Sequence, residues 1–470
     1  DKRKSKKEDK RKEGKMKQKI TGNTDKSNYL FDNKALVTLI APLIVEQLLT
    51  ILVGMADSIM VASVGEAAVS GVSLVDQIMV LLINVFAALA TGGAVVAGQY
   101  IGRKDEKSAC KAATQLVWFV SLSAVAIMIL VYFGKDIILN QVFGHITAEV
   151  KGHADIYLLI VTASIPFIAL YNGGAAIFRA MGNSQVSMRV SLLMNAINVT
   201  GNAILVFGLR IGTAGVAIPT LISRMVATIV ITVLLCNQTR ILHIERTLKI
   251  RFDGRMIRKI LAIGVPNGLE NSMFQLGKIL VLSLVSTFGT YAIAANAVSN
   301  AIALFQILPG MAISLAITTV ISQCVGANDY EQVHYYLKKL LAIIYVAMVG
   351  TVALIFLALP LILKAYNLSD QTAAAATNII HFHGISAMII WPLSFALPAA
   401  YRAAGDAKAC MYTSIVSMWI FRIGFSYLVG KYMGLGVFGV WVAMVIDWVV
   451  RAICFVIRYF NGKWKHGAIV

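Results

Sequence analysis

Two carboxylates interrupt an apolar segment near the start of the chain. The segment, PLIVEQLLTILVGMADSIMVASVG, covers residues 42–65 and contains Glu46 and Asp57. It is long enough to cross a bilayer as a helix, and the spacing of the acids, about three turns, places both on one face. A carboxylate in hydrocarbon costs roughly 2.5–3.5 kcal/mol. We therefore hypothesise a cation or proton site at Asp57, with Glu46 as a candidate for a central cavity. The alternative is two buried acids that neighbouring helices satisfy.

Three asparagines form a second polar group. Asn195, Asn198 and Asn202 are spaced by three, four and seven residues, which places them on one helix face. Their amides can donate to a carboxylate or offer oxygens to a hard cation. The alternative is hydrogen bonding that only packs helices together. In the next apolar segment Pro219 lacks a backbone donor, which predicts either a cavity-lining irregularity or a plain kink.

The second half of the chain also carries charges at membrane depth. Glu270 and Lys278 share one apolar segment. Lys278 is either a counter-charge for Glu270 or for Asp57, or a side chain that snorkels along a cavity wall. We also expect an ion pair between Arg422 and Asp447, which lie on adjacent segments. The other charges within apolar segments are Asp76 and Arg224.

The composition is that of a membrane protein. Of 470 residues, 58% are hydrophobic and only 14% are charged, which indicates a polytopic helical protein. The net charge of +19 would suit nucleic acid, but much of it lies in a polar tail over residues 1–34, so we expect no nucleic-acid partner. The five cysteines match no metal or disulfide pattern. No nucleophile–base pair, phosphate loop or zinc motif occurs, so we expect no enzyme and no cofactor.

Apolar periodicity predicts twelve transmembrane helices. Their predicted ranges are 36–62, 68–100, 110–133, 154–178, 186–208, 213–236, 259–287, 291–323, 335–363, 374–401, 408–430 and 435–458. The fold class is therefore all-α and polytopic. The predicted parts are a basic disordered tail (1–34), an N-terminal six-helix lobe (35–236), a cytoplasmic connector (237–258), a C-terminal six-helix lobe (259–460) and a short tail (461–470). Lysine and arginine concentrate in alternate loops, which predicts that both termini are cytoplasmic in a plasma or inner membrane.

The two halves of the chain repeat each other. In six pairs of identical residues, the two members are separated by the same number of positions along the chain. The motifs FRAMG at 178–182 and YRAAG at 401–405 are separated by one position fewer. The six pairs are Pro42 and Pro266, Glu46 and Glu270, Gly65 and Gly289, Gln99 and Gln323, Gly102 and Gly326, and Asp105 and Asp329. Two six-helix repeats that begin on the same side are related by a pseudo-twofold axis along the membrane normal. Such lobes enclose a central cavity that suits alternating access.

At these motifs the chain resembles the multidrug and toxic compound extrusion (MATE) family. The resemblance covers about residues 36–465, and its motifs include VGMADSIMVASVG (53–65), GQYIGRKD (98–105), SQCVGAND (322–329) and YRAAGD (401–406). It implies an antiporter that exports amphipathic, mostly cationic organic compounds against an inward flow of protons or sodium. We expect a monomer in the bilayer.

The resemblance also implies roles for single residues. Asp57 matches the carboxylate that the family uses in its N-terminal lobe, and Thr220 matches its hydroxyl contact to the cation. Asn198 and Asn202 correspond to an Asn and an Asp in sodium-linked members, so one anionic ligand is missing here. We therefore expect proton coupling, with Na⁺ at this site as the alternative. Glu270 is about one turn away from the cation-binding Glu of other branches, so it is an inexact match.

Two other functions remain open from the sequence. A flippase for lipid-linked sugars of the same fold group would want a basic central cavity for pyrophosphate, whereas most of the candidate cavity residues are acidic. A scaffold or sensor that moves nothing would not need buried acids on a repeated frame.

Overall fold

The computed structural model describes residues 29–245 and 251–470, and within these ranges it is all-helical. The predicted all-α class is confirmed. Most of the tail at 1–34 and the centre of the connector lie outside the described residues. The α-helices are α2 (Asn33–Ala62), α3 (Glu66–Gly102), α4 (Glu106–Phe133), α5 (Lys135–Ile137), α6 (Ala148–Thr162), α7 (Ile165–Ala180), α8 (Ser184–Asn202), α9 (Ala214–Leu235), α10 (Gly254–Ser286), α11 (Thr290–Gly326), α12 (Tyr330–Ala365), α13 (Asp370–Trp391), α14 (Leu397–Ala403), α15 (Ala407–Ser417) and α16 (Gly436–Asn461).

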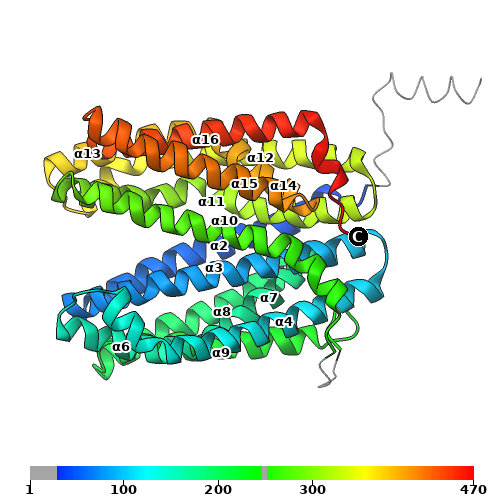
Figure 1. Cartoon of the computed structure of the whole chain (residues 1–470), viewed down its shortest axis with the longest axis horizontal. Helices are drawn as coiled ribbons and strands as arrows, with labels where there is room; N and C mark the ends of the chain where they lie inside the picture. The colour runs from blue at the N-terminus through cyan, green and yellow to red at the C-terminus, as the bar shows by residue number, and fades with distance from the viewer. Residues whose placement is uncertain (1–28, 246–250) are drawn as a thin grey trace, which may run out of the picture.

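Several of these helices continue as π-helix. The π-helical segments are Ile138–Val142, Ala203–Gly208, Pro392–Ala396, Met418–Gly424 and Ser426–Tyr432, and a short 3₁₀-helix covers Lys463–His466. In the described residues, ten helices are long and apolar enough to cross a membrane, and the bent pair α6–α7 makes an eleventh. The remaining long helix is α10, which is less apolar because it carries Glu270, Lys278 and a basic first turn. It runs beside α3 along the molecule (Figure 1).

One predicted span is broken. The segment predicted as a single helix over 154–178 consists of α6 and α7, which meet at an angle of 48°. Pro166 lies in the first turn of α7, where its missing N–H costs no helical hydrogen bond. The equivalent helix of the second half is also irregular, because α13 passes through a π-helical segment at Pro392 before α14. Both breaks follow from prolines that the sequence places in these spans.

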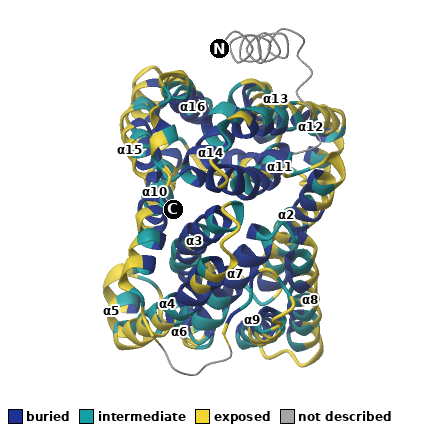
Figure 2. Cartoon of the chain, turned by 90° about the vertical axis from the view of Figure 1, so that its right-hand side faces the viewer, coloured by how far each residue is buried: buried dark blue, intermediate teal, exposed yellow. Residues whose placement is uncertain are grey.

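The helices form two lobes that pack face to face, α2–α9 in one and α10–α16 in the other (Figure 1). The first helix of each lobe packs against the second helix of the opposite lobe, α10 on α3 and α2 on α11. The buried residues lie where these helices meet (Figure 2). The contact between the first helix of one lobe and the second helix of the other therefore occurs twice between the lobes.

The internal repeat holds at the level of the backbone. Gly65 and Gly289 precede α3 and α11 with φ angles of +139° and +108°, a region that favours glycine. Lys104 and Asn328, which the same difference in residue number relates, follow the same two helices with φ angles of +62° and +55°. The repeated sequence motifs thus encode the same helix ends in both lobes.

A pair of equivalent hydrogen bonds closes the lobes at the end of the molecule that contains the described chain ends. Gln99 Nε2 donates to the carbonyl of Ala403 at 2.9 Å, and Gln323 Nε2 donates to the carbonyl of Ala180 at 2.7 Å. Both glutamine side chains are at least nine-tenths buried. Each bond crosses from one lobe to the other, so we call this end the closed end.

Two glycines allow the closest approach at the closed end. A Cβ atom on Gly102 would lie 2.0 Å from the carbonyl oxygen of Gln323, and one on Gly326 would lie 1.9 Å from the carbonyl oxygen of Gln99. Because no side chain fits there, the ends of α3 and α11 can cross in contact. The backbone N–H of Ile469 also donates to Gln99 Oε1 at 3.2 Å, so the C-terminal segment is part of the same contact.

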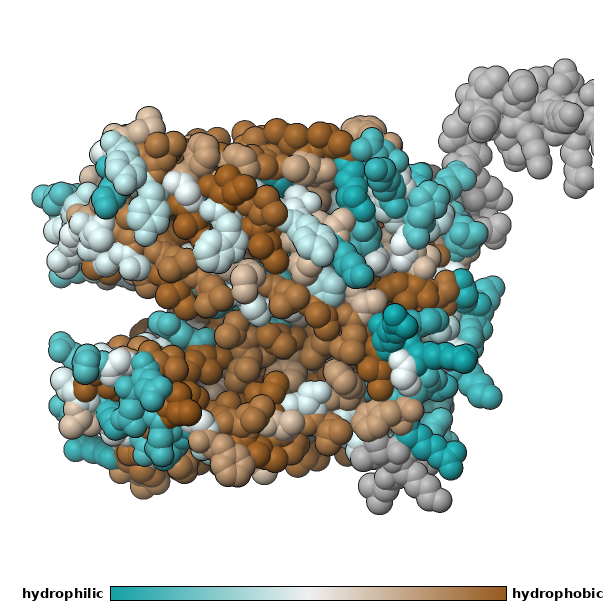
Figure 3. Space-filling view, viewed as in Figure 1, coloured by the Kyte–Doolittle hydropathy of each residue, from teal (hydrophilic) through white to brown (hydrophobic). Residues whose placement is uncertain are grey.

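At the opposite end the lobes separate. The space-filling view shows a cleft that opens away from the chain ends and is lined mainly by apolar side chains (Figure 3). The structure therefore has one closed end and one open end, and a cavity with polar lining residues lies within the N-terminal lobe.

Candidate functional site

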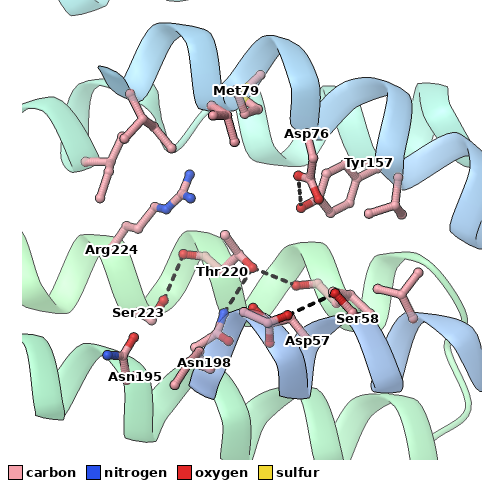
Figure 4. Close-up of a pocket in the computed structure, with 18 of the residues that line it drawn as sticks. Asp57, Ser58, Asp76, Met79, Tyr157, Asn195, Asn198, Thr220, Ser223 and Arg224 are labelled. Carbon is pink, nitrogen blue, oxygen red and sulfur yellow. Dashed lines mark hydrogen bonds between the residues drawn. The ribbon is translucent and has the colours of Figure 1, made fainter. Parts of the chain in front are cut away.

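The cavity of the N-terminal lobe has a volume of about 470 Å³ and is formed by α2, α3 and α6–α9. About half of the residues that line it are polar, and the rest are apolar (Figure 4). The polar lining residues are Thr50, Asp57, Ser58, Ser73, Asp76, Tyr157, Asn195, Asn198, Thr220, Ser223 and Arg224. Concave, mostly apolar sites with a few polar groups are typical of small-molecule binding.

The four residues predicted at the coupling site form one hydrogen-bonded chain. Asn202 Nδ2 donates to Asp57 Oδ1 at 2.8 Å and to Asn198 Oδ1 at 3.3 Å. Asn198 Nδ2 donates in turn to Thr220 Oγ1 at 3.1 Å. Asp57 is half-buried, whereas Asn202 is fully buried beneath it. The amides thus orient the carboxylate and leave it facing the cavity.

The local sequence explains how α8 and α9 meet. Gly201 packs on Pro219, since a Cβ atom added to Gly201 would lie 2.7 Å from the proline ring. Thr220 Oγ1 donates to the carbonyl of Val216 at 2.9 Å, so its lone pairs remain available to Asn198. Immediately after Asn202 the helix widens into the π-helical segment Ala203–Gly208. This irregularity lies in the helix before Pro219, whereas α9 itself is assigned as α-helix from Ala214 to Leu235 with Pro219 inside it.

Three further groups in the cavity were not assigned a role from the sequence. Asp76 of α3 accepts a hydrogen bond from the hydroxyl of Tyr157 at 2.8 Å, and Arg224 of α9 donates to Ser164 Oγ at 2.7 Å. Ser164 lies at the bend between α6 and α7. Within the described residues, Arg224 makes no ion pair with Asp57 or Asp76. The signal available in the sequence was their charge at membrane depth, and for Arg224 its position one turn after Thr220.

Comparison with known proteins identifies the fold and the family. The MatE family model matches residues 42–204 and 266–428, which together make up more than half of the chain. The chain belongs to the MatE family. The first match begins at position 42 and the second at position 266, which is the pairing of Pro42 with Pro266 in the sequence repeat.

MatE relatives and structures match over almost the whole length. The uncharacterized transporter YisQ of Bacillus subtilis is 28% identical, with 92% of this chain and 94% of YisQ covered. The Thermotoga maritima protein named "Probable multidrug resistance protein NorM" is 23% identical, with 93% and 94% covered. An outward-facing structure of a multidrug resistance MATE family transporter superposes with a TM-score of 0.85, at 22% identity, covering 91% of this chain and 95% of that one. The family and the fold point to a transporter rather than an enzyme.

Glu46 and Glu270 do not line the cavities of this MatE chain. Glu46 pairs with Arg179 at 3.5 Å and accepts from Ser187 Oγ at 2.6 Å. Glu270 pairs with Arg402 at 3.1 Å. Both arginines belong to the repeated FRAMG and YRAAG motifs, so the two halves form the same glutamate–arginine pair. The structure therefore places Glu46 in an interhelical ion pair instead of a central cavity.

Two predicted charge pairings are absent from the described residues. Lys278 makes no ion pair with Glu270 or Asp57 there, but it does line a cavity of the C-terminal lobe, which was the alternative expectation. Its ammonium instead lies 5.0 Å from the ring centroid of Phe274.

The second wrong pairing is that of Arg422 with Asp447. Asp447 pairs with Arg451, four residues later on the same helix, at 3.1 Å, and accepts from Ser417 at 2.5 Å. The guanidinium of Arg422 lies over Phe274 instead, 5.0 Å from the ring centroid. The partner on the same helix takes the carboxylate because its side chain reaches it one turn away.

Proposed function

We propose that this chain is a secondary antiporter that exports amphipathic, mostly cationic organic compounds in exchange for protons by alternating access. The observation that carries this proposal is the hydrogen-bonded chain of Thr220, Asn198 and Asn202, which ends on Asp57 at the wall of an internal cavity. A buried carboxyl group favours its neutral form, and a nearby cation favours its ionised form. One carboxylate can therefore hold a proton or face a cationic substrate, and each state disfavours the other.

The donor set supports protons over sodium as the coupling ion. Sodium is a hard cation that prefers oxygen ligands, but the amide nitrogens of Asn198 and Asn202 are turned toward Thr220 and Asp57. Within the described residues, the second oxygen of Asp57 receives no hydrogen bond, so it can accept a proton. This chain has Asn202 at the position where sodium-linked members of the family have an Asp. Asp57 is therefore the one anion among the four predicted residues.

The open and closed ends support alternating access. The lobes meet through equivalent contacts at one end and part at the other (Figure 3), which is the geometry that rocking of two repeats requires. We propose that the closed end is cytoplasmic, with both termini, and that the chain acts in the plasma or inner membrane. Cysteines placed at Lys104 and Lys135 in a cysteine-free variant test this. An impermeant reagent outside the cell should label position 135 and leave position 104 unlabelled, and the reverse pattern would contradict the orientation.

Counterflow in proteoliposomes tests the coupling ion. Vesicles loaded with a fluorescent organic cation should show transport driven by an imposed pH gradient without sodium. A sodium gradient at constant pH should drive none. Sodium-driven transport at constant pH would contradict proton coupling, and the absence of any gradient-driven transport would contradict antiport.

A flippase for lipid-linked sugars remains the second candidate. The observation that favours it is a cavity in the C-terminal lobe lined by Lys278 and Arg422, because such substrates carry pyrophosphate. The acidic cavity around Asp57 and Asp76 weighs against it. Movement of a labelled pyrophosphate lipid between leaflets, without a pH gradient, would replace our proposal by this one.

A further inference from the structure

The C-terminal lobe contains a second cavity at the position equivalent to the first. Its volume is about 310 Å³, and it is formed by α10, α11, α16 and the π-helical segment Met418–Gly424. Positions 278, 281, 282, 300 and 304 line it, and each is the repeat counterpart of a position that lines the first cavity. The two cavities are therefore counterparts under the internal repeat.

Their chemistry is opposite. In the first cavity, two carboxylates and one arginine face the space. In the second, Lys278 and Arg422 face it, and none of the residues lining it is a carboxylate. The substitutions at equivalent positions are Lys278 for Gly54, Val281 for Asp57 and Asn300 for Asp76.

Arg422 is the more informative of the two cations. It is 9% exposed, and its Nε has no hydrogen-bond partner in the described part of the chain. The Oδ1 atom of Asp447, the carboxylate expected to pair with it, is taken by Arg451 and Ser417, and Arg422 makes no ion pair with Asp447 in the described residues. A buried guanidinium without a close ion-pair partner is unfavourable, and Arg422 lines the cavity, so an anion bound there could pair with it. Lys278 lies beside the same ring of Phe274 and is exposed.

The rest of the lining adds donors and apolar surface. Asn296 Oδ1 accepts from the indole of Trp441 at 3.0 Å, which leaves the Asn296 amide nitrogen free to donate. Lys278, Arg422 and this amide thus present donors, which is the pattern that binds carboxylate, sulfonate or phosphate groups. Trp441, Met444 and Leu304 supply a broad apolar wall beside them.

We propose that this cavity binds the anionic group of an amphipathic organic molecule, with Arg422 and Lys278 on the anion and Trp441 beside the apolar part. The inference rests on the proposed transport function and narrows its substrate class. The preferred solute then carries a carboxylate, sulfonate or phosphate, as in a zwitterion, rather than a cationic group alone. The N-terminal cavity takes the coupling proton, and the C-terminal cavity selects for the anionic group.

A matched pair of dyes tests the proposal. Rhodamine 19 carries a free carboxylate, and rhodamine 6G is its ethyl ester, so the two differ only in that group. Binding to the chain in phosphatidylcholine nanodiscs is measured by fluorescence anisotropy, with empty nanodiscs subtracted. We expect roughly tenfold tighter binding of rhodamine 19, since one charge-assisted hydrogen bond contributes about that factor. Equal binding, or tighter binding of the ester, would overturn the proposal.

Variants assign the effect to the cavity. Arg422→Met and Lys278→Met should each bring the ratio of the affinities for the two dyes close to one. Arg422→Lys keeps the positive charge and should retain part of the preference for rhodamine 19. This variant therefore separates loss of charge from loss of folding. Lys431→Met is the matched control, because Lys431 also lies over an aromatic ring, that of Tyr432 at 5.9 Å, but does not line the cavity. A preference that survives in both cavity variants would contradict the assignment.

A lipid arm identifies the source of the anion. Nanodiscs with added phosphatidylglycerol should leave the preference for rhodamine 19 unchanged if the anionic group belongs to a solute. If phosphatidylglycerol abolishes the preference and phosphatidylcholine alone restores it, the headgroup of a net anionic lipid is the occupant, and the assignment to a solute is overturned. Binding at equilibrium needs no gradient, so the two proposals can fail separately. A preference for rhodamine 19 without gradient-driven transport would reject the antiport proposal and keep the anion site. Gradient-driven transport without that preference would keep the antiport proposal and reject the anion site.

Discussion

The two lobes share a backbone and differ in charge. Both have a glycine before the second helix, a residue with positive φ after it, a buried glutamate–arginine pair and a glutamine that crosses to the other lobe. Yet the N-terminal cavity contains two carboxylates and a hydrogen-bonded chain that ends on Asp57, whereas the C-terminal cavity contains two cations, and the Nε of Arg422 has no hydrogen-bond partner in the described residues. The repeat thus sets how the helices pack and leaves the cavity side chains free to differ. From this comparison we infer that the N-terminal cavity binds positive charge and the C-terminal cavity binds negative charge during transport.

The largest effect should come from Asp57→Asn. This change keeps the shape and the acceptor for Asn202 but removes the group that can exchange a proton. We expect gradient-driven export in proteoliposomes to fall to the level of protein-free vesicles, while the amount of inserted protein is unchanged. Asp136→Asn, on an exposed residue outside both cavities, is the control and should export normally. Export by Asp57→Asn at the wild-type rate would remove the carboxylate from the mechanism and with it the contrast between the lobes.

The glutamate–arginine pairs should differ in how much stability they contribute. Arg402→Met leaves the half-buried Glu270 without its ion-pair partner, and because loss of one partner of a fully buried pair costs about 3–5 kcal/mol, we expect a loss somewhat below that range. Arg179→Met should cost less, because Glu46 keeps its hydrogen bond from Ser187. Thermal unfolding in detergent, followed by size-exclusion chromatography, measures both. Recovery of stability in the double variant Glu270→Gln/Arg402→Met would support the explanation, and equal losses in the two lobes would contradict it.

The closed end should respond equally to changes in either lobe. Alanine at Gly102 or Gly326 places a methyl group against the backbone of the opposite helix, and such overpacking typically costs about 1–3 kcal/mol. We expect both variants to populate a state that is more open at this end. Spin labels at Lys107 and Lys338, in a cysteine-free background, should report a longer distance by pulsed electron resonance. A change in only one of the two variants would show that the symmetry of the closed end is only apparent.

The smallest effect should be at the helix caps outside the membrane. Asp105 caps α4 by accepting from the backbone of Ser108 at 3.0 Å, and Asp329 caps α12 by accepting from Gln332 at 3.0 Å. Alanine at either position should cost about 1 kcal/mol. Equal losses in thermal unfolding would confirm that the two caps are equivalent.

The first of these caps should also depend on pH. Hydrogen bonding from the side chain of Ser108 lowers the pKa of Asp105 below its ordinary value. The stability from this cap is therefore present above the ordinary carboxyl pKa and is lost as the pH falls through the lowered value. The protection factors of the amides in the first turn of α4, which correct for the intrinsic pH dependence of exchange, should fall over that acidic range in the wild type. In Asp105→Asn they should not change over this range, and a parallel fall in that variant would contradict the assignment.

The sequence predicted those features that local spacing controls. Amides at three-, four- and seven-residue intervals had to share a face of α8, and the hydrogen bonds of Asn198 and Asn202 follow from that. Contacts between distant segments were not accessible in this way. Periodicity says nothing of which arginine meets Glu46, because Arg179 lies on another helix, and the meeting of Asp76 with Tyr157 depends likewise on how the helices pack.

The pairing of Asp447 was a different kind of error. Its partner Arg451 is four residues away on the same helix, so the spacing rule that found the asparagine face would also have found this pair. The expectation of Arg422 as the partner gave weight to adjacent helices over a neighbour one turn away. The consequence is that Arg422 makes no ion pair with Asp447 in the described residues, which is the observation behind the proposed anion site.

The two glutamine contacts at the closed end affect how long that end stays closed. A neutral hydrogen bond contributes only about 0.5–1.5 kcal/mol net, and water can replace both when the lobes part. Together, Gln99 and Gln323 would then lengthen the residence time of the closed end by roughly one to two orders of magnitude. A contact of that strength delays leakage without trapping the protein.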